Sequence, residues 1–412
     1  MSEKKENYKK SIIKQLYFGN VMSCAEISER INKSLPLTNK ILQELIKEDY
    51  IDETGLAPSS GGRRPATYSL RPGIQYIVSV AMDQFVTRIV IMDVHNKYVT
   101  GVEKFEMDIW NNPNPIFELA EKIEEYINSS GIPKAKIAGI GIGMPGFVDS
   151  AKGINYSFQE PLYNIPEYIS AKTGLDVFID NDSSLIALAE LRFGKAINKS
   201  NAMVLNVGWG IGLGLVLNGN LFRGYNGFAG EFSHISLFTN DKICTVCGKT
   251  GCLETESSLT AMVDKTRKAI KNGRTSALKD QVFDTEIEDA FGYIMKAAQK
   301  GDQLAIENFS EAGYNIGKGV AILIHLLNPE TIILSGRGSL AGKIWKASIQ
   351  QALNEHCIPR LAASTEIELS SLGYEAELIG SAALVMENYG NGQLNDVMQA
   401  ETETQLQPGD MA

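Results

Sequence analysis

Two stretches of this chain join a strand-like apolar run to closely spaced glycines, and they restrict its fold more than any other feature. The segment KIAGIGIGMPGFVD (136–149) predicts a buried strand that enters a glycine-rich loop. The segment NAMVLNVGWGIGLGLVLNGNLF (201–222) predicts a hairpin with glycines at close intervals. Both patterns are typical of proteins in which strands and helices pack in layers.

Helical and strand patterns alternate around these two stretches. Residues 175–194, LDVFIDNDSSLIALAELRFG, predict a strand, a loop and a helix. Near the other end of the chain, ETIILSGRG (330–338) predicts a strand and ELIGSAALVMENY (377–389) predicts a closing helix. This succession predicts an α/β body made of two related halves around a cleft.

The first 71 residues follow a different pattern, which predicts three short helices and a hairpin. Ser23 with Glu26 three residues later forms a capping box that starts the second helix at about Cys24. Pro36 suits the first turn of the third helix. Helices with this spacing, followed by a hairpin, predict a winged helix-turn-helix DNA-binding domain over residues 1–71.

The third predicted helix supplies the candidate contacts to DNA bases. Its apolar residues at 37, 41, 42 and 45 are expected to face inward. The polar side chains near its start are expected to face outward and to reach bases in the major groove: Thr38, Asn39, Lys40 and Gln43.

The predicted hairpin carries a basic tip, GGRRPA, with Arg63 and Arg64 between glycines and a proline. An extended basic segment of this kind can lie in a narrow minor groove. Residues 1–71 hold 12 Lys and Arg against 9 Asp and Glu, whereas the rest of the chain holds 27 against 40. A basic head on an acidic body favours nucleic-acid binding. The alternative is a small helical protein-interaction module with a basic loop.

The remaining bulk properties indicate a soluble protein. No apolar run of the chain is long enough to span a bilayer, and the N-terminus lacks the apolar core of a signal peptide, so we expect a cytoplasmic protein. The polar segment 391–412 lacks periodicity and is expected to be a disordered tail.

A cluster of metal-ligand residue types lies in the segment GEFSHISLFTNDKICTVCGKTGCLE (230–254). One histidine and three cysteines are the usual donor set for a closed, tetrahedral structural zinc site. The predicted zinc ligands are His234, Cys244, Cys247 and Cys252. The alternative is a set of reduced thiols on a surface loop.

Six segments in order give the chain a resemblance to the ROK family of repressors, open reading frames and kinases. They are GGRRPA, GIGMPGFVD, DNDSSLIALAE, GWGIGLGLVLNGNLFRGYNGFAGEFSH, CGKTGCLE and LNPETIILSG. The chain resembles the DNA-binding repressor branch, whose members respond to sugars such as N-acetylglucosamine, xylose or glucose. The resemblance implies that residues 72–390 form a two-lobed, actin-like (ribonuclease H-like) ATPase body that binds a sugar.

The same resemblance implies the residues of a sugar site. Its predicted members are Gly146, Asn181, Asp182, Glu231, His234 and Glu254. Carboxylates and amides suit this role because they form charge-assisted hydrogen bonds with pairs of sugar hydroxyls. Asp182 corresponds to the catalytic base of the family's kinases. The alternative for Asp182 is a plain helix N-cap, with Ser183 or Ser184 as competing caps.

The chain departs from the family pattern at several positions. The first strand pair has no glycine between Ser79 and Asp93, where the kinases carry a glycine turn that holds phosphate. Trp209 replaces a small hydroxylated residue in the second phosphate loop. One extra residue separates Cys244 from Cys247, and Ser233 replaces the glycine that often precedes the histidine.

Together these features predict a zinc-containing, sugar-responsive transcriptional repressor. It would bind operator DNA as a homodimer or homotetramer, and without phosphoryl transfer. One alternative is an ATP-dependent hexose or N-acetylhexosamine kinase with a regulatory DNA-binding head. A second alternative is a DNA-binding protein whose effector is another protein rather than a sugar.

Overall fold

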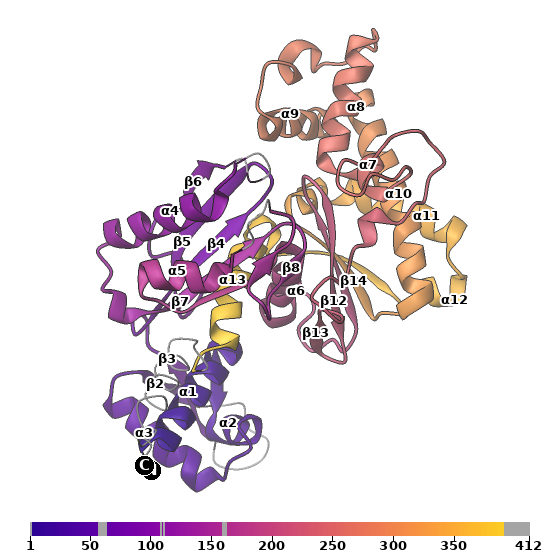
Figure 1. Ribbon diagram of the computed structural model, residues 1–412. Coiled ribbons are helices and arrows are strands. Elements are labelled where there is room, and N and C mark those ends of the chain that lie inside the picture. The colour runs from indigo at the N-terminus through magenta and orange to yellow at the C-terminus, as the bar shows by residue number, and fades with distance from the viewer. Residues whose placement is uncertain (1, 57–63, 108, 110–111, 159–162, 391–412) are drawn as a thin grey trace, which may run out of the picture. The chain divides into compact units, whose positions relative to one another are not determined.

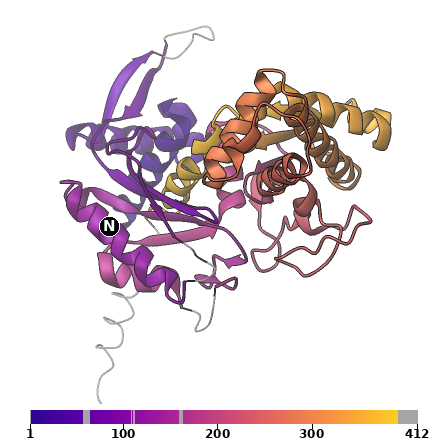
Figure 2. The same cartoon turned by 90° about the horizontal axis from the view of Figure 1, so that it is seen from above.

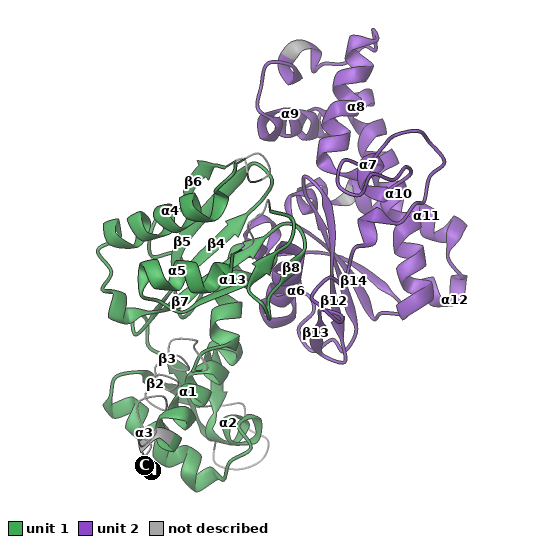
Figure 3. Cartoon of the chain, viewed as in Figure 1, with its two compact units in different colours: residues 1–181, 378–412 green, residues 182–377 purple. Residues whose placement is uncertain are grey.

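The computed structural model describes residues 2–56, 64–107, 109, 112–158 and 163–390 (Figure 1). These residues belong to two compact units, which Figure 3 colours separately. Unit 1 comprises residues 1–181 and 378–412, and unit 2 comprises residues 182–377. The backbone passes between the units twice, after Asn181 and after Glu377. The predicted tail at 391–412 and the predicted DNA contact Arg63 lie outside the described residues.

Unit 1 begins with three helices and a small antiparallel sheet. The sheet has the strand order β1-β3-β2, and its apolar face and the three helices enclose side chains such as Ile12, Leu16 and Ile27. The elements are α1 (Ser2–Gly19), β1 (Val21–Ser23), α2 (Cys24–Arg30), α3 (Leu35–Lys47), β2 (Ile51–Leu56) and β3 (Ala66–Leu70).

Local sequence signals explain where these helices begin. The Ser23 hydroxyl accepts a hydrogen bond from the Glu26 amide, and the Glu26 carboxylate accepts one from the Ser23 amide at 2.7 Å. This capping box confirms the predicted start of α2 at Cys24. Pro36 lies in the first turn of α3, as predicted, where its missing N–H costs no hydrogen bond.

The prediction that Thr38 faces outward is wrong. Its side chain is completely buried, and its hydroxyl donates a hydrogen bond to the Ser34 carbonyl at 3.1 Å. A threonine can satisfy its hydroxyl on the preceding helical turn, so burial costs it little. Asn39, Lys40 and Gln43 are exposed, as predicted.

The hairpin is longer on its first strand than predicted. The sequence pattern predicts hairpin strands at residues 50–53 and 66–70. The first corresponds to β2 at Ile51–Leu56, and the second matches β3 at Ala66–Leu70. The two strands pair antiparallel from Ile51 opposite Leu70 to Leu56 opposite Ala66. Figure 2 shows the chain from above, with these two strands side by side. The sequence patterns did not predict β1, which adds a third strand beside β3.

A five-stranded sheet in the order β10-β7-β4-β5-β6 forms the rest of unit 1. Neighbouring strands are antiparallel between β4, β5 and β6, and parallel between β4, β7 and β10. The strands are β4 (Tyr76–Met82), β5 (Val86–Asp93), β6 (Glu103–Glu106), β7 (Ile137–Met144) and β10 (Val177–Asn181). The helices are α4 (Pro115–Ser129), η1 (Lys134–Lys136), α5 (Ile165–Thr173) and α13 (Ala376–Glu387), and a separate ribbon pairs β8 (Val148–Asp149) with β9 (Ile154–Asn155).

The glycines of the first opening stretch allow the closing helix to pack on β7. A side chain at Gly141 would overlap the Ser381 carbonyl, and one at Gly139 would press on Val385. The Ser381 hydroxyl also donates to the Val80 carbonyl at 2.9 Å. The last helix of the chain therefore belongs to the layer that covers the first sheet.

Unit 2 contains a second five-stranded sheet, in the order β13-β12-β11-β14-β15. Its first three strands are antiparallel neighbours, and β14 and β15 follow in parallel on the other side of β11. This repeats the pattern of unit 1 and confirms the prediction of two related α/β halves. The strands are β11 (Ala202–Val207), β12 (Ile211–Leu217), β13 (Asn220–Phe222), β14 (Thr331–Ser335) and β15 (Glu366–Leu369).

The helices of unit 2 enclose its larger apolar core. Helix α6 begins at Asp182, directly after β10 ends, so the loop predicted between that strand and helix is absent. The apolar second half of α10, residues 314–327, packs mostly inside unit 2, for example through Gly317 against Ala352. The helices are α6 (Asp182–Phe193), η2 (Phe232–His234), α7 (Leu253–Ser257), α8 (Leu259–Lys271), η3 (Lys279–Val282), α9 (Ile287–Gln299), α10 (Gln303–Leu327), η4 (Arg337–Ala341), α11 (Lys343–His356), α12 (Pro359–Ala362) and η5 (Gly373–Glu375). Across the residues described, none of the helices is both long and apolar enough to cross a membrane.

Candidate sugar and metal site

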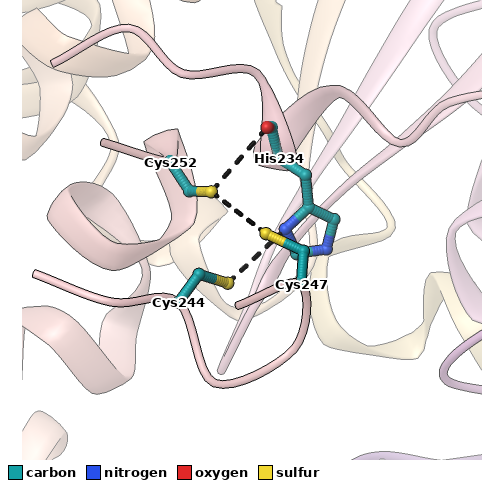
Figure 4. A group of neighbouring side chains, drawn as sticks. All are labelled: His234, Cys244, Cys247 and Cys252. Carbon is teal, nitrogen blue, oxygen red and sulfur yellow. Dashed lines mark hydrogen bonds between the residues drawn. The ribbon is translucent and has the colours of Figure 1, made fainter. Parts of the chain in front are cut away.

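The four predicted metal ligands lie together in unit 2 (Figure 4). One donor atom from each of them lies within 4.8 Å of all the others. The Cys247 and Cys252 sulfurs are 3.4 Å apart, and the Cys244 sulfur lies 3.6 Å from Nδ1 of His234. One ion can therefore contact all four side chains.

The extra residue between Cys244 and Cys247 does not remove Cys244 from the cluster. The Gly248 amide donates to the Cys244 carbonyl at 2.9 Å, and the Cys244 amide donates to the Lys249 carbonyl at 2.8 Å. These bonds form a tight turn that returns the chain to the cluster. Gly251 has φ +78°, and a side chain there would overlap the Phe238 carbonyl, so the loop requires glycine at this position.

The thiols differ in how readily they ionise. Burial and the neighbouring cysteines raise the pKa of Cys252 to about 12. The Lys249 backbone N–H is the main cause of a lowered pKa at Cys247. Because Cys252 resists ionisation, its thiolate requires a nearby positive charge, which a bound metal ion would supply.

His234 connects the cysteines to the predicted sugar residues. Its Nδ1 faces Cys244, and its Nε2 lies 3.7 Å from a carboxylate oxygen of Glu231. The two ring nitrogens thus face different partners. With this arrangement, one nitrogen could bind a metal ion while the other faces the side of the predicted sugar residues.

The carboxylates of Asp182 and Glu254 are each held by hydrogen bonds within unit 2. Asp182, the first residue of α6, accepts from the Ser183 amide at 2.7 Å and from the Asn206 side-chain amide at 3.2 Å. Oε2 of Glu254 accepts from the Ile211 amide at 3.1 Å and from the Ser233 hydroxyl at 3.2 Å. These contacts fix the orientation of both side chains before any ligand binds.

Glu231 belongs to the same electrostatic environment. Partial burial, together with the charges of Asp182 and Glu254, raises the pKa of Glu231 to about 7. Its side chain is still 43% exposed. Because Glu231 readily holds a proton, it can donate a hydrogen bond, while the two other carboxylates accept them. Sugar hydroxyls need both kinds of partner.

The other two predicted sugar residues, Gly146 and Asn181, lie in unit 1. Gly146 has φ +95°, and a side chain there would overlap that of Ser157. The Asn181 amide donates to the Gly146 carbonyl at 3.1 Å, so the two predicted residues are in direct contact. Their role in sugar binding stays a prediction.

Two further residues contact this site and are not among its predicted members. Ser233 contacts Glu254 across 21 positions of sequence, and Asn206 contacts Asp182 across 24. For Ser233, the sequence signal is the serine itself, which stands where the family often has glycine. No sequence signal distinguished Asn206 from the other polar residues of the hairpin.

Three features of the two segments that the resemblance assigns to phosphate loops involve contacts within the protein itself. In the β4–β5 turn, the Asp83 carboxylate accepts from the amides of Phe85 and Val86, at 2.9 and 2.8 Å. In the second loop, a side chain at Gly212 or Gly214 would overlap helix α6, so these glycines serve packing.

The third feature is Trp209, which is 5% exposed and packs edge-on against Phe291 in the core of unit 2. The Arg337 guanidinium lies 5.0 Å from the Trp209 ring centre and 4.0 Å from that of Tyr374. A cation held between two aromatic rings is a stable arrangement within one unit. Trp209 therefore has a structural role in this fold.

Comparison with known proteins identifies the family to which the chain is similar. The family model described as "ROK family" matches residues 102–388. A xylose repressor from Caldicellulosiruptor bescii is 28% identical over 92% of this chain and 94% of its own. A glucokinase from Halalkalibacterium halodurans is 30% identical over 65% of this chain and 82% of its own.

A solved structure extends the likeness to the whole fold. A ROK family transcriptional regulator, described as a homologue of the Escherichia coli Mlc protein, aligns over 95% of this chain and 100% of its own. That alignment has a TM-score of 0.75 and 27% sequence identity. The two related α/β units therefore form the actin-like architecture of these proteins, and the chain belongs to the ROK family.

Proposed function

We propose that this protein is a sugar-responsive transcriptional repressor that binds DNA through residues 1–71 and a sugar through its body. One observation carries the proposal. The relative named as a xylose repressor matches 92% of the chain, which is more than the chain without its head and so must include part of the head, whereas the relative named as a glucokinase matches 65%. The head is thus a feature that the chain has in common with repressors.

The composition and exposed surface of the head support DNA binding. Helix α3 buries its apolar face, and Asn39, Lys40 and Gln43 are exposed on it. In a winged helix-turn-helix, the corresponding helix enters the major groove. Arg64 is also exposed, and with Arg63 it would contact the minor groove beside it.

We propose that the sugar hydroxyls bind Asp182, Glu231, His234 and Glu254. Fixed carboxylates and an imidazole nitrogen recognise hydroxyl pairs through directional, charge-assisted hydrogen bonds. Gly146 and Asn181 are proposed as further sugar contacts. The fixed orientations of Asp182 and Glu254 support this assignment, since a rigid site loses less entropy on binding.

We also propose that the cluster of one histidine and three cysteines holds a structural zinc ion. In a tetrahedral zinc site, bonds of about 2.3 Å to sulfur and about 2.1 Å to nitrogen separate a sulfur from a nitrogen ligand by about 3.6 Å. Cys244 and His234 have this separation. Such an ion would join the segments that carry Glu231 and Glu254, because His234 and Cys252 are close in sequence to each of them.

Phosphoryl transfer is not part of the proposed function. The amides of the β4–β5 turn already bind the Asp83 carboxylate, whose negative charge would repel a phosphate. In the second loop the Ile211 amide binds Glu254. With these donors engaged, we expect no ordinary kinase activity, although the resemblance predicts that Asp182 corresponds to the base of the family's kinases.

The glucokinase likeness makes an ATP-dependent sugar kinase the second candidate. A coupled assay with ATP and D-glucose, D-xylose or N-acetyl-D-glucosamine separates the two. The repressor proposal predicts no turnover above background together with a melting shift on adding one of these sugars. Turnover at ordinary enzyme rates would support the kinase instead. If none of a broad panel of sugars and sugar phosphates shifts the melting temperature, a protein effector is favoured.

DNA recognition by this proposal needs two heads. Winged-helix regulators commonly bind half-sites about one helical turn, or a multiple of it, apart. We therefore propose a homodimer or homotetramer, in which sugar binding changes the spacing of the heads. Light scattering at several protein concentrations measures this assembly.

A further inference from the structure

The hydroxyl of Ser233 is bonded to one of the proposed sugar-binding carboxylates. Ser233 is 3% exposed and lies in η2 between Glu231 and His234. Its Oγ donates to Oε2 of Glu254 at 3.2 Å. In the family pattern this position is often glycine, which has no side chain to make the bond.

The hydrogen bond from Ser233 is the second of two that one carboxylate oxygen of Glu254 accepts. Oε2 of Glu254 accepts two hydrogen bonds, from Ser233 and from the Ile211 amide. Oε1 of Glu254 accepts none from the part of the chain that the structure describes. A carboxylate oxygen can accept two hydrogen bonds, so Oε2 is saturated and Oε1 remains available.

The bond also spans the two segments that the metal ligands join. Ser233 precedes the ligand His234, and Glu254 follows the ligand Cys252 by two residues. The proposed metal ion would fix the backbones of these segments. The Ser233 hydroxyl fixes the side chain, because a glutamate has three side-chain torsions that backbone restraint alone leaves free.

We propose that Ser233 is a positioning residue of the sugar site. It holds Oε2 of Glu254 so that Oε1 faces one particular hydroxyl of the bound sugar. This inference rests on the proposed function, since it concerns the same site. It adds a determinant of sugar affinity and selectivity that lies outside the set of residues expected to touch the sugar.

The test compares two serine-to-alanine variants of the full-length, zinc-loaded protein. Ser233→Ala removes the bond to Glu254. Ser236→Ala removes a hydroxyl from the same loop, where it donates to the Thr250 carbonyl at 3.0 Å and contacts no carboxylate among the described residues. Zinc content and melting temperature, measured for each variant, verify that the loop is intact.

Sugar binding is measured by calorimetry with whichever of D-glucose, D-xylose or N-acetyl-D-glucosamine the wild type binds, and with the monodeoxy analogues of that sugar. Ser233→Ala removes a hydrogen bond to a charged group, and this bond positions the carboxylate that binds the sugar. The variant should therefore bind the sugar roughly tenfold more weakly than wild type. Ser236→Ala should leave the affinity within about twofold, since no sugar contact changes.

The monodeoxy analogues separate positioning from a general loosening of the site. The analogue that lacks the hydroxyl facing Oε1 should bind wild type and Ser233→Ala equally, whereas the other analogues should show the full loss. Equal losses for every analogue, or an unchanged affinity in Ser233→Ala, would overturn the inference and leave the proposed function intact. If the wild type binds none of the three sugars, the proposed function fails for them and the inference fails with it.

Discussion

Replacing Cys247 by serine should destabilise unit 2, because it removes one ligand of a cross-link that closes a large loop. The outermost ligands, His234 and Cys252, are 18 positions apart. Fixing the ends of a loop of this length restricts the unfolded chain by about 3 kcal/mol, by the relation established for disulfide cross-links. In a unit of roughly 150–250 residues, each 1 kcal/mol shifts the melting temperature by about 2–4 °C, so the expected decrease is about 6–12 °C.

The assay is differential scanning calorimetry of wild type and Cys247→Ser, with zinc content measured by mass spectrometry. Cys24→Ser is the matched control, since Cys24 is in the head and belongs to no metal cluster in the described residues. Wild type treated with a strong chelator should melt like Cys247→Ser, and Cys24→Ser should keep one zinc per chain. A Cys247→Ser protein with full zinc content and an unchanged melting temperature would refute a structural metal held by four ligands.

Three further predictions concern other parts of the chain. Replacing both Lys40 and Gln43 by alanine should weaken specific DNA binding by about tenfold to a hundredfold in gel-shift titrations, since each base contact contributes roughly 1–3 kcal/mol. Thr38→Val, at a buried position, should leave DNA affinity unchanged, and an equal loss there would contradict the corrected orientation of α3. Asp182→Asn should weaken sugar binding roughly tenfold by calorimetry while the melting temperature stays within a few degrees, because it loses the charge and keeps the shape. Gly214→Ala should destabilise unit 2 by about 1–3 kcal/mol in urea titrations, because the added methyl group meets α6; unchanged stability would show that this glycine has another role.

Sequence signals that act over a few residues predicted their structures well. The capping box of Ser23 and Glu26 gave the start of α2, and Pro36 gave that of α3. Residue type and spacing predict four metal ligands, and the structure brings these four side chains together as a group that could hold an ion. Each of these signals depends on neighbours within one or two turns or within one loop.

The features that the sequence did not predict depend mostly on contacts between distant segments. The polar side chain of Thr38 favours an exposed position, but the residue is buried because its hydroxyl donates a hydrogen bond to the Ser34 carbonyl one turn earlier. Gly212 and Gly214 resembled a phosphate loop, whereas they allow α6 to pack against β12. The bond from Ser233 to Glu254 joins residues 21 positions apart, and no periodic pattern reports such a pair.

We propose above all that one chain binds a sugar and changes its affinity for DNA in response. The most direct test is fluorescence anisotropy with a duplex that the protein itself selects from a random library, measured with and without a sugar that shifts its melting temperature. Our account predicts that a single sequence is enriched and that saturating sugar changes its dissociation constant by at least about tenfold, equivalent to about 1.4 kcal/mol of coupling. Failure to enrich any sequence, or an identical dissociation constant with and without the bound sugar, would contradict it.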